Sequence, residues 1–83
     1  MITEELKQLT VDKSVDARGT SCPGPLLAAK KAIGEIAEGQ VMEVLSADEG
    51  TLHDIPKWCA KKGYEYLGAV EEPGFSRLFI KKV

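Results

Sequence analysis

Cysteine, histidine, long apolar runs and an excess of basic charge are all scarce or missing in this chain, and each scarcity excludes a class of protein. Two cysteines are too few for the disulfide framework of a small secreted domain, which normally carries four or more. Two cysteines and one histidine also match no common zinc-site spacing. No apolar run approaches the ~18 residues of a membrane span, and the first residues lack the pattern of a signal peptide. We therefore expect reduced thiols, no metal ion, no membrane contact and a cytoplasmic location.

The net charge and the length of the chain further limit its possible binding partners and its domain organisation. The 83 residues include 11 lysines and arginines against 13 aspartates and glutamates, a formal net charge of −2. Without a basic excess to neutralise phosphates, direct nucleic-acid binding is disfavoured. A chain of this length forms one small domain, and 43% hydrophobic against 29% charged residues is typical of a globular one. We expect residues 1–10 to be a polar lead-in and residues 11–83 to form that domain.

Apolar periodicity predicts the elements in the first half of the chain. Alternating apolar and polar residues predict a strand over residues 11–17. Apolar spacings of three and four predict a helix over residues 26–37, which Gly39 ends in a left-handed conformation. A short, partly β-branched run predicts a second strand over residues 41–45.

The second half is predicted to open with another helix, over residues 51–62. Thr51 and Asp54 resemble a capping box at its start, and Gly63 ends it. Pro56 lacks an amide donor and biases its predecessor away from helical angles, so we expect an irregular first turn and a regular helix from Pro56 onward.

Two final strands, over residues 64–71 and 75–82, are joined by Pro73 and Gly74 as the central residues of a type II turn. The predicted order is strand, helix, strand, helix, strand, strand. Right-handed crossovers would place both helices on one face of a four-stranded mixed sheet. The expected fold class is therefore α+β.

The segment Cys22-Pro23-Gly24-Pro25 lies between the first predicted strand and the first predicted helix. Each proline biases the residue before it toward extended angles, so Cys22 is expected to lie outside the helix. Gly24 is then the N-cap and Pro25 the first helical residue, where a missing amide donor costs nothing. The free amides of the first turn point back toward the thiol.

A helix N-terminus next to Cys22 changes the chemistry of its thiol. The helix dipole stabilises a nearby anion by up to ~2 kcal/mol, which lowers the thiol pKa from ~8.5 toward ~7.5. Arg18, close in sequence, adds a little to this effect. A thiol whose pKa is near ambient pH suits sulfur exchange. Dithiol chemistry is disfavoured because Pro25 stands where a second cysteine is needed, and the alternative is that Cys22 is a small apolar loop residue.

These motifs resemble the TusA/SirA family of small sulfur-carrier proteins. The resemblance runs from about Val11 to Lys82 and rests on four segments, Asp16-Ala17-Arg18-Gly19, Cys22-Pro23-Gly24-Pro25, Asp54-Ile55-Pro56 and Trp58-Cys59. It implies a two-layer α/β sandwich whose last strand is antiparallel to the rest. It also implies that Cys22 carries sulfane sulfur as a transient persulfide, with no other cofactor, and that Pro23 and Pro25 are the motif prolines.

Two positions depart from the family pattern. The second helix of the family is often introduced by Asp-Pro, where this chain has Asp48-Glu49. Gly24 is smaller than the usual occupant of the variable motif position. Both departures bear on which partner docks.

Several other side chains have both a packing interpretation and a functional one. Cys59 is predicted to be a buried packing residue, the alternative being a resolving thiol close to Cys22. His53 is predicted to be a solvated helix residue rather than a base. Trp58 is expected to be half-buried, with a docking anchor as the alternative. Lys30 and Lys31 are expected on a solvated helix face, which would also suit an acidic partner.

The leading functional hypothesis is a sulfur carrier. Cys22 would receive sulfane sulfur from a donor such as a cysteine desulfurase or a rhodanese-like protein and present it to an acceptor sulfurtransferase. No acid–base pair or phosphate loop is evident, which favours a relay protein over a stand-alone enzyme. We expect the protein to be a monomer. The alternatives are a regulatory or protein-interaction domain with a structural Cys22, and an RNA-binding module, which the negative charge opposes. The destination of the sulfur stays open among tRNA thiolation, molybdenum-cofactor chemistry and oxidative sulfur metabolism.

Overall fold

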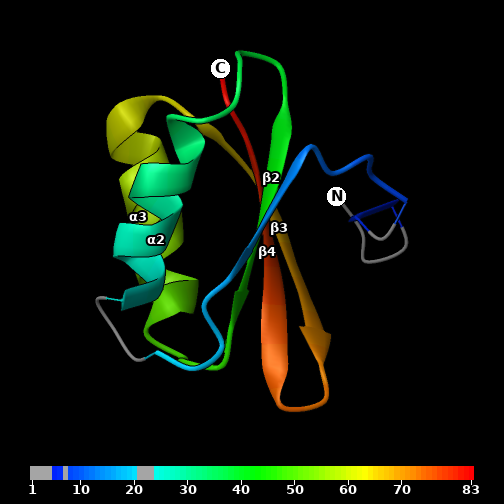
Figure 1. The fold of residues 1–83 in the computed structure, drawn as a ribbon, viewed down its shortest axis with the longest axis vertical. Coiled ribbons are helices and arrows are strands. Elements are labelled where there is room, and N and C mark those ends of the chain that lie inside the picture. Colours follow the sequence, from blue (N-terminus) through cyan, green and yellow to red (C-terminus); the bar gives the residue numbers. More distant parts are fainter. Residues whose placement is uncertain (1–4, 7, 21–23) are drawn as a thin grey trace.

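The computed structural model describes residues 5–6, 8–20 and 24–83, and these form two helices and a four-stranded sheet. Both helices lie on one face of the sheet (Figure 1). The elements along the chain are β1 (Lys13–Asp16), α2 (Gly24–Ile33), β2 (Val41–Ser46), α3 (Thr51–Lys62), β3 (Glu65–Glu72) and β4 (Phe75–Lys81). The predicted α+β fold and element order are confirmed.

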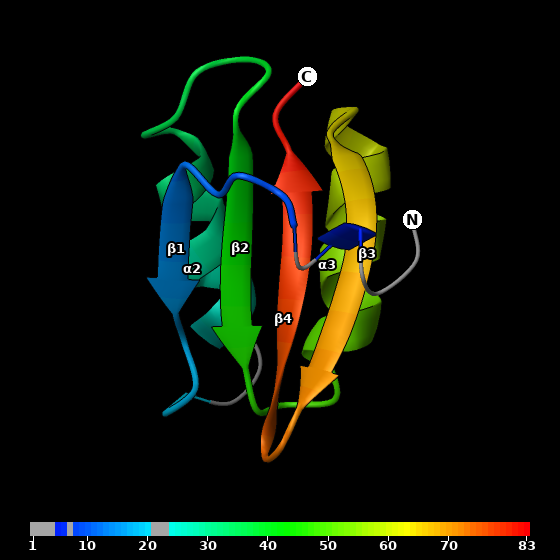
Figure 2. The ribbon, with the colours of Figure 1, turned by 90° about the vertical axis from the view of Figure 1, so that its right-hand side faces the viewer.

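The sheet is mixed, with the strand order β1-β2-β4-β3 (Figure 2). β1 pairs with β2 in parallel, and β4 is antiparallel to both β2 and β3. The last strand therefore runs against the other three, as the family resemblance implied. Because β1 and β2 are parallel, their carboxyl ends meet at one end of the sheet, and the connections to α2 and α3 both start there.

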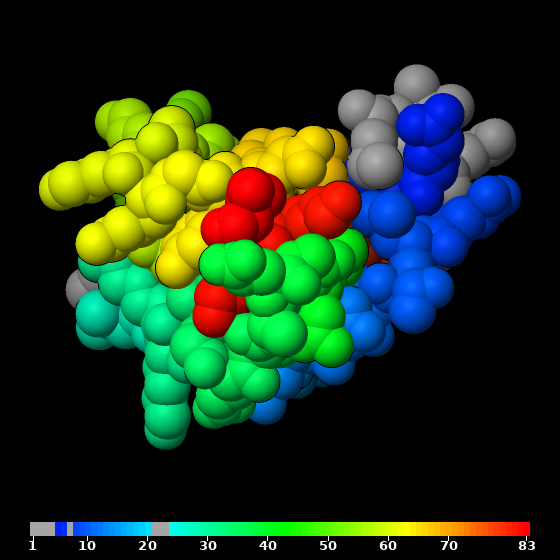
Figure 3. All heavy atoms as spheres, turned by 90° about the horizontal axis from the view of Figure 1, so that it is seen from above, coloured from blue at the N-terminus to red at the C-terminus, as the bar shows by residue number. Residues whose placement is uncertain are grey.

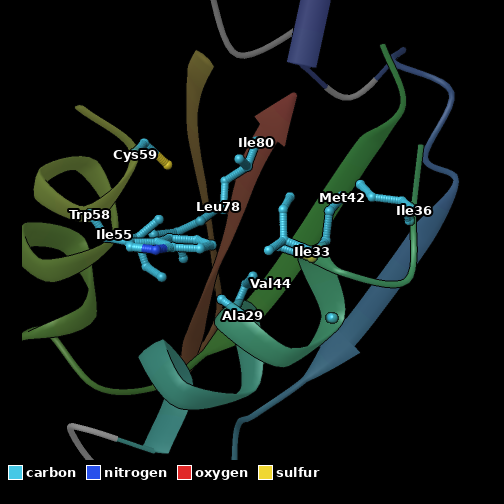
Figure 4. Close-up of a cluster of buried hydrophobic side chains, with 11 residues drawn as sticks. Ala29, Ile33, Ile36, Met42, Val44, Ile55, Trp58, Cys59, Leu78 and Ile80 are labelled. Carbon is cyan, nitrogen blue, oxygen red and sulfur yellow. The ribbon is translucent and has the colours of Figure 1, made fainter. Parts of the chain in front are cut away.

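The main hydrophobic core lies between the helices and the sheet (Figure 4). Alternate residues of the central strands face it, because successive side chains of a strand point to opposite faces. The helices contribute residues spaced three and four apart. Its buried members are Ala29, Ala32, Ile33, Ile36, Met42, Val44, Ile55, Trp58, Cys59, Leu78 and Ile80. This packing fixes both helices on the sheet.

A second, smaller cluster covers part of the opposite sheet face. Residues of the N-terminal segment cross this outer face (Figure 2). Leu6 is only 2% exposed and packs with Val41, Val70 and Phe79. Its Cδ1 atom lies 3.0 Å from the position that a Cβ would take at Gly68, so the bare backbone of that glycine makes room for the leucine. The expected polar lead-in thus contributes a core residue.

The first helix ends earlier than predicted. α2 stops at Ile33, and Gly39, expected as its terminator, instead has a φ of 88° in the turn before β2. The Lys82 ammonium donates hydrogen bonds to the carbonyl oxygens of Ile33 (2.9 Å) and Ile36 (2.8 Å). A lysine from the C-terminal end of the chain therefore satisfies carbonyls at the end of the helix. Figure 3 shows this end of the chain against the α2–β2 connection.

The second helix has the predicted bounds but not the predicted opening. The capping box is wrong: the N-cap is Gly50, which makes no side-chain cap bond, and Thr51 is a buried first residue of α3. The Thr51 hydroxyl accepts a hydrogen bond from Ser46 (2.9 Å), which ties the helix start to the end of β2. α3 continues through Pro56 without interruption. The first amides of the helix, from Thr51 to His53, bond carbonyls three residues back.

The C-terminal strand pair matches the prediction closely. Gly63 ends α3 with a φ of 80°, and the amide of Tyr64 bonds back to the carbonyl of Cys59, so β3 starts one residue later than predicted. Gly74, in the turn between β3 and β4, has a φ of 84°, which the second central position of a type II turn requires.

Candidate functional site

The candidate site lies at the end of the sheet where β1 and β2 finish. The start of α2, the start of α3 and the β3–β4 hairpin all lie at this end (Figures 1 and 2). Loops that follow parallel strands gather at one edge of a sheet, which is where α/β proteins commonly place their sites. The topology therefore brings these three connections to the end of the sheet where α2 starts with Gly24 and Pro25, the last two residues of the Cys-Pro-Gly-Pro motif.

Two of the predicted site residues, Cys22 and Pro23, lie outside the described residues. The structure does describe the residues on either side. α2 begins at Gly24, one residue earlier than predicted, and Pro25 lies in its first turn with a buried side chain. This first turn contains no acidic residue, so no carboxylate of the helix neutralises its positive end. Cys22 thus precedes the start of a described helix by two residues.

Thr20 and Gly24, the described residues on either side of positions 21–23, are in close contact. A Cβ atom added at Gly24 would lie 2.8 Å from both Cβ and Oγ1 of Thr20. The Thr20 hydroxyl donates to the carbonyl oxygen of Ala17 (2.9 Å), and the Thr20 amide bonds the same oxygen (3.2 Å). Ala17 in turn donates its amide to Leu45 of β2. Thr20, which the sequence analysis did not single out, is therefore tied to the sheet.

Arg18 is held by a neighbour two residues away. Its guanidinium donates two hydrogen bonds to the Asp16 carboxylate (2.9 and 2.7 Å), and its backbone amide donates a third (3.1 Å). These bonds lower the pKa of the Asp16 carboxyl to about 2. The guanidinium also lies over the Phe75 ring, 5.0 Å from its centroid. Most of its charge is thus balanced by Asp16, so the help that Arg18 was expected to give a nearby thiolate is small.

Cys59 packs in the core, as predicted. It is 1% exposed and lies among the core side chains between α3 and the sheet (Figure 4). Burial raises the pKa of its thiol to about 11. A thiol that is inaccessible and protonated near neutral pH is a poor nucleophile. Cys59 is therefore unsuited to take part in sulfur exchange in the folded protein.

The raised pKa of Cys59 makes the stability depend on alkaline pH. Between about pH 9 and pH 11 the unfolded chain releases the Cys59 proton while the folded protein keeps it. The stabilisation that comes from keeping Cys59 protonated is complete below pH 9 and is lost as the pH passes 11. The free energy of unfolding should therefore fall by about 2 kcal/mol across this range. Urea denaturation at successive pH values measures it.

The matched control for this pH dependence is Cys59→Ala. Burial, and to a smaller extent the nearby Cys59, also raise the pKa of Tyr66, so the difference between the parent and the variant reports the thiol together with its effect on Tyr66. The variant should lose less stability than the parent between pH 9 and pH 11. Parallel curves for the two proteins would show that Cys59 does not titrate with a raised pKa.

The remaining candidates are distributed around this end and along the helices. His53 is exposed on α3, as predicted, and Lys30 and Lys31 are exposed on α2. Trp58 was expected to be half-buried, but it is 7% exposed and packs edge-to-face against Tyr64 with ring centroids 5.4 Å apart. That packing makes Trp58 part of the core, so it offers no anchor for a partner.

An open pocket of about 380 Å³ lies beside the candidate site, between the start of α3 and the β3–β4 hairpin. Leu52 and Phe75 give it apolar surface, and four carboxylate residues line it, namely Asp48, Glu49, Glu71 and Glu72. Phe75 is the ring that Arg18 covers, so the pocket adjoins the β1–α2 connection. Within the described ranges, these carboxylates included, no three or more His, Cys, Asp or Glu side chains form a group that could hold a metal ion. Nor does any described helix have the length and apolarity to cross a membrane.

Comparison with known proteins gives consistent matches. The family described as "Sulfurtransferase TusA" matches residues 13–82. The sulfur carrier protein TusA of Pseudomonas entomophila is 39% identical over 77 residues, which covers 93% of this chain and 96% of that protein. The sulfur carrier protein TusA of Allochromatium vinosum is 37% identical over 71 residues, 86% of this chain and 93% of that protein.

The fold has a counterpart among solved structures. The crystal structure of a SirA-like protein from Desulfitobacterium hafniense superposes with a TM-score of 0.69 at 33% sequence identity. The match covers 83% of this chain and 95% of that protein. The likeness is one of fold rather than of one motif, because it spans most of each chain.

Proposed function

Because the chain belongs to the TusA family, we propose that it is a sulfur carrier that holds sulfane sulfur as a persulfide on Cys22. The names of its relatives support the carrier role. The observation that carries the proposal for this residue is the start of α2 at Gly24, two residues after Cys22, with no acidic side chain in its first turn. Free amides and the positive end of the helix dipole then favour an anionic sulfur at that place.

The proposed transfer is a thiol exchange with no net oxidation. The Cys22 thiolate attacks the outer sulfur of a persulfide on a donor protein. A bond forms between the Cys22 sulfur and that outer sulfur, and the sulfur–sulfur bond of the donor breaks. The electron pair leaves with the donor cysteine, which takes up a proton as its thiol. In the delivery step, the thiolate of an acceptor cysteine attacks the outer sulfur of the Cys22 persulfide, and the Cys22 thiolate leaves. Neither exchange consumes an oxidant or a reductant.

Such a carrier works between two proteins. We propose a cysteine desulfurase or a rhodanese-like protein as the donor and a sulfurtransferase as the acceptor. The partners then supply the acid and base groups for proton transfer. The alternative, a regulatory domain with a structural Cys22, would take up no sulfur.

Mass spectrometry after incubation with a persulfide donor tests the proposal. We expect one added sulfur atom on the peptide that contains Cys22, released again by a thiol reductant. The Cys59→Ala variant should take up sulfur as the parent does, since that thiol is buried. Sulfur found on Cys59 instead, or no uptake at all, would overturn the assignment.

A further inference from the structure

The contact between Thr20 and Gly24 leaves no space for a side chain at position 24. The position of a Cβ is fixed by the backbone, and at Gly24 it would lie 2.8 Å from the Cβ of Thr20. Real Cβ atoms essentially never approach other heavy atoms so closely, because packed interiors and turns sit at van der Waals separation. A residue larger than glycine at this place therefore has to move something.

No rotation of the threonine side chain relieves this contact. Rotation about χ1 moves Oγ1 and Cγ2, but it leaves the Cβ atom where the backbone puts it. The backbone of Thr20 is in turn bonded to Ala17, whose amide is bonded to β2. On the other side, Gly24 belongs to α2, which the core holds through Ala29. Relief thus requires a shift of the turn or of the helix start.

The two residues flank the segment that carries Cys22. Three residues, 21–23, join them in the sequence. Any shift of one end relative to the other changes the position of this short segment with respect to the rest of the molecule. Gly24 was noted as smaller than the usual occupant of the motif position, and Thr20 is the neighbour that requires it to be small here.

We propose that Thr20 is a positioning residue for the Cys22 sulfur, and that Thr20 and Gly24 form a size-matched pair that sets how this sulfur meets a partner. The inference rests on the proposed carrier function. Transfer between two proteins needs the attacking and leaving sulfurs in line, and a displacement of about 1 Å costs as much as a hundredfold in such steps. A small alkylating reagent, which approaches from any direction, is much less sensitive to that position.

The central test compares transfer with alkylation in Gly24→Ala. We expect the rate of persulfide transfer from the donor to fall at least about tenfold, while the rate of alkylation of Cys22 by iodoacetamide changes less than about threefold. The control Gly19→Ala adds a methyl group in the same turn, where a Cβ would meet nothing within 4 Å. It should transfer sulfur at the rate of the parent.

Two double variants identify Thr20 as the partner. Gly24→Ala combined with Thr20→Gly removes the opposing Cβ and should recover most of the lost transfer. Gly24→Ala combined with Thr20→Ala removes Oγ1 but keeps that Cβ, and should recover much less. If Gly24→Ala does not fold, the same contrast is read from urea denaturation, where only the Thr20→Gly combination should restore folding.

The outcomes separate this inference from the function on which it rests. A parent that takes up no sulfur on Cys22 contradicts the carrier function. A parent that transfers sulfur while Gly24→Ala transfers it equally fast contradicts the positioning role alone. Equal losses in Gly24→Ala and Gly19→Ala, or equal recovery in the two double variants, would also overturn it.

Discussion

Near pH 7, Cys22 is expected to react with iodoacetamide at least about a hundredfold faster than Cys59. Burial raises the pKa of the Cys59 thiol to about 11, which leaves less than about one molecule in a thousand as thiolate at neutral pH. The side chain is also 1% exposed, so reagent reaches it only after an opening of the fold. Cys22 precedes the N-terminal end of α2, where a thiolate is stabilised.

Peptide mass spectrometry after timed alkylation measures the two rates in one sample. In urea above the unfolding transition the rates should become similar, because both thiols then have ordinary pKa values and full access. The pH dependence of Cys22 alkylation should have its midpoint below the ~8.5 of a free cysteine. Similar rates in the native protein, or a Cys22 midpoint at or above that value, would show that the helix end does not act on the sulfur.

The element order was predictable because each element carries its own local signal. The apolar spacing along α2 and α3 and the Pro73-Gly74 turn are set by residues close together in sequence. Gly63 ended α3 where predicted for the same reason, since a left-handed terminator acts on the preceding turn. Crossover handedness and burial then leave few ways to arrange such elements.

The misassigned features depend on residues far apart in the sequence. α2 ends at Ile33, whose carbonyl oxygen accepts a hydrogen bond from Lys82, 49 residues away. Gly39 has its positive φ in the turn before β2 instead. Thr51 resembled a capping residue, but its hydroxyl accepts a hydrogen bond from Ser46, which links β2 to α3. Local patterns cannot reveal partners that only the tertiary fold supplies.

The candidate site was predictable in part. The position of the motif between a strand and a helix followed from its prolines, and the structure confirms that α2 starts within the motif. The steric pairing of Thr20 with Gly24 gave no such signal, because three residues separate them and their approach is set by the sheet and the helix on either side. The pairing of Arg18 with Asp16 had a local signal, since the two opposite charges are only two residues apart, where β1 ends and the turn begins.

Leu6→Ala should lower the free energy of unfolding by about 3 kcal/mol, within the range for buried leucines. Leu6 is 2% exposed, and its removal would leave a cavity over Gly68 and beside Val70 and Phe79. Leu6 belongs with Val70 and Phe79 to the second cluster, and the N-terminal segment crosses the sheet face opposite both helices (Figure 2). Urea denaturation near pH 7, followed by circular dichroism, measures the loss.

The control is Leu27→Ala, which removes the same atoms from a leucine that is 58% exposed. Its effect on stability should stay within about 0.5 kcal/mol, as for other surface substitutions. A small domain has only about 5 to 10 kcal/mol of stability, so the loss of Leu6 packing would be a large part of the whole. Equal midpoints for Leu6→Ala and Leu27→Ala would show that the N-terminal segment does not stabilise the sheet, and that the outer face is held by the residues of β2, β3 and β4 alone.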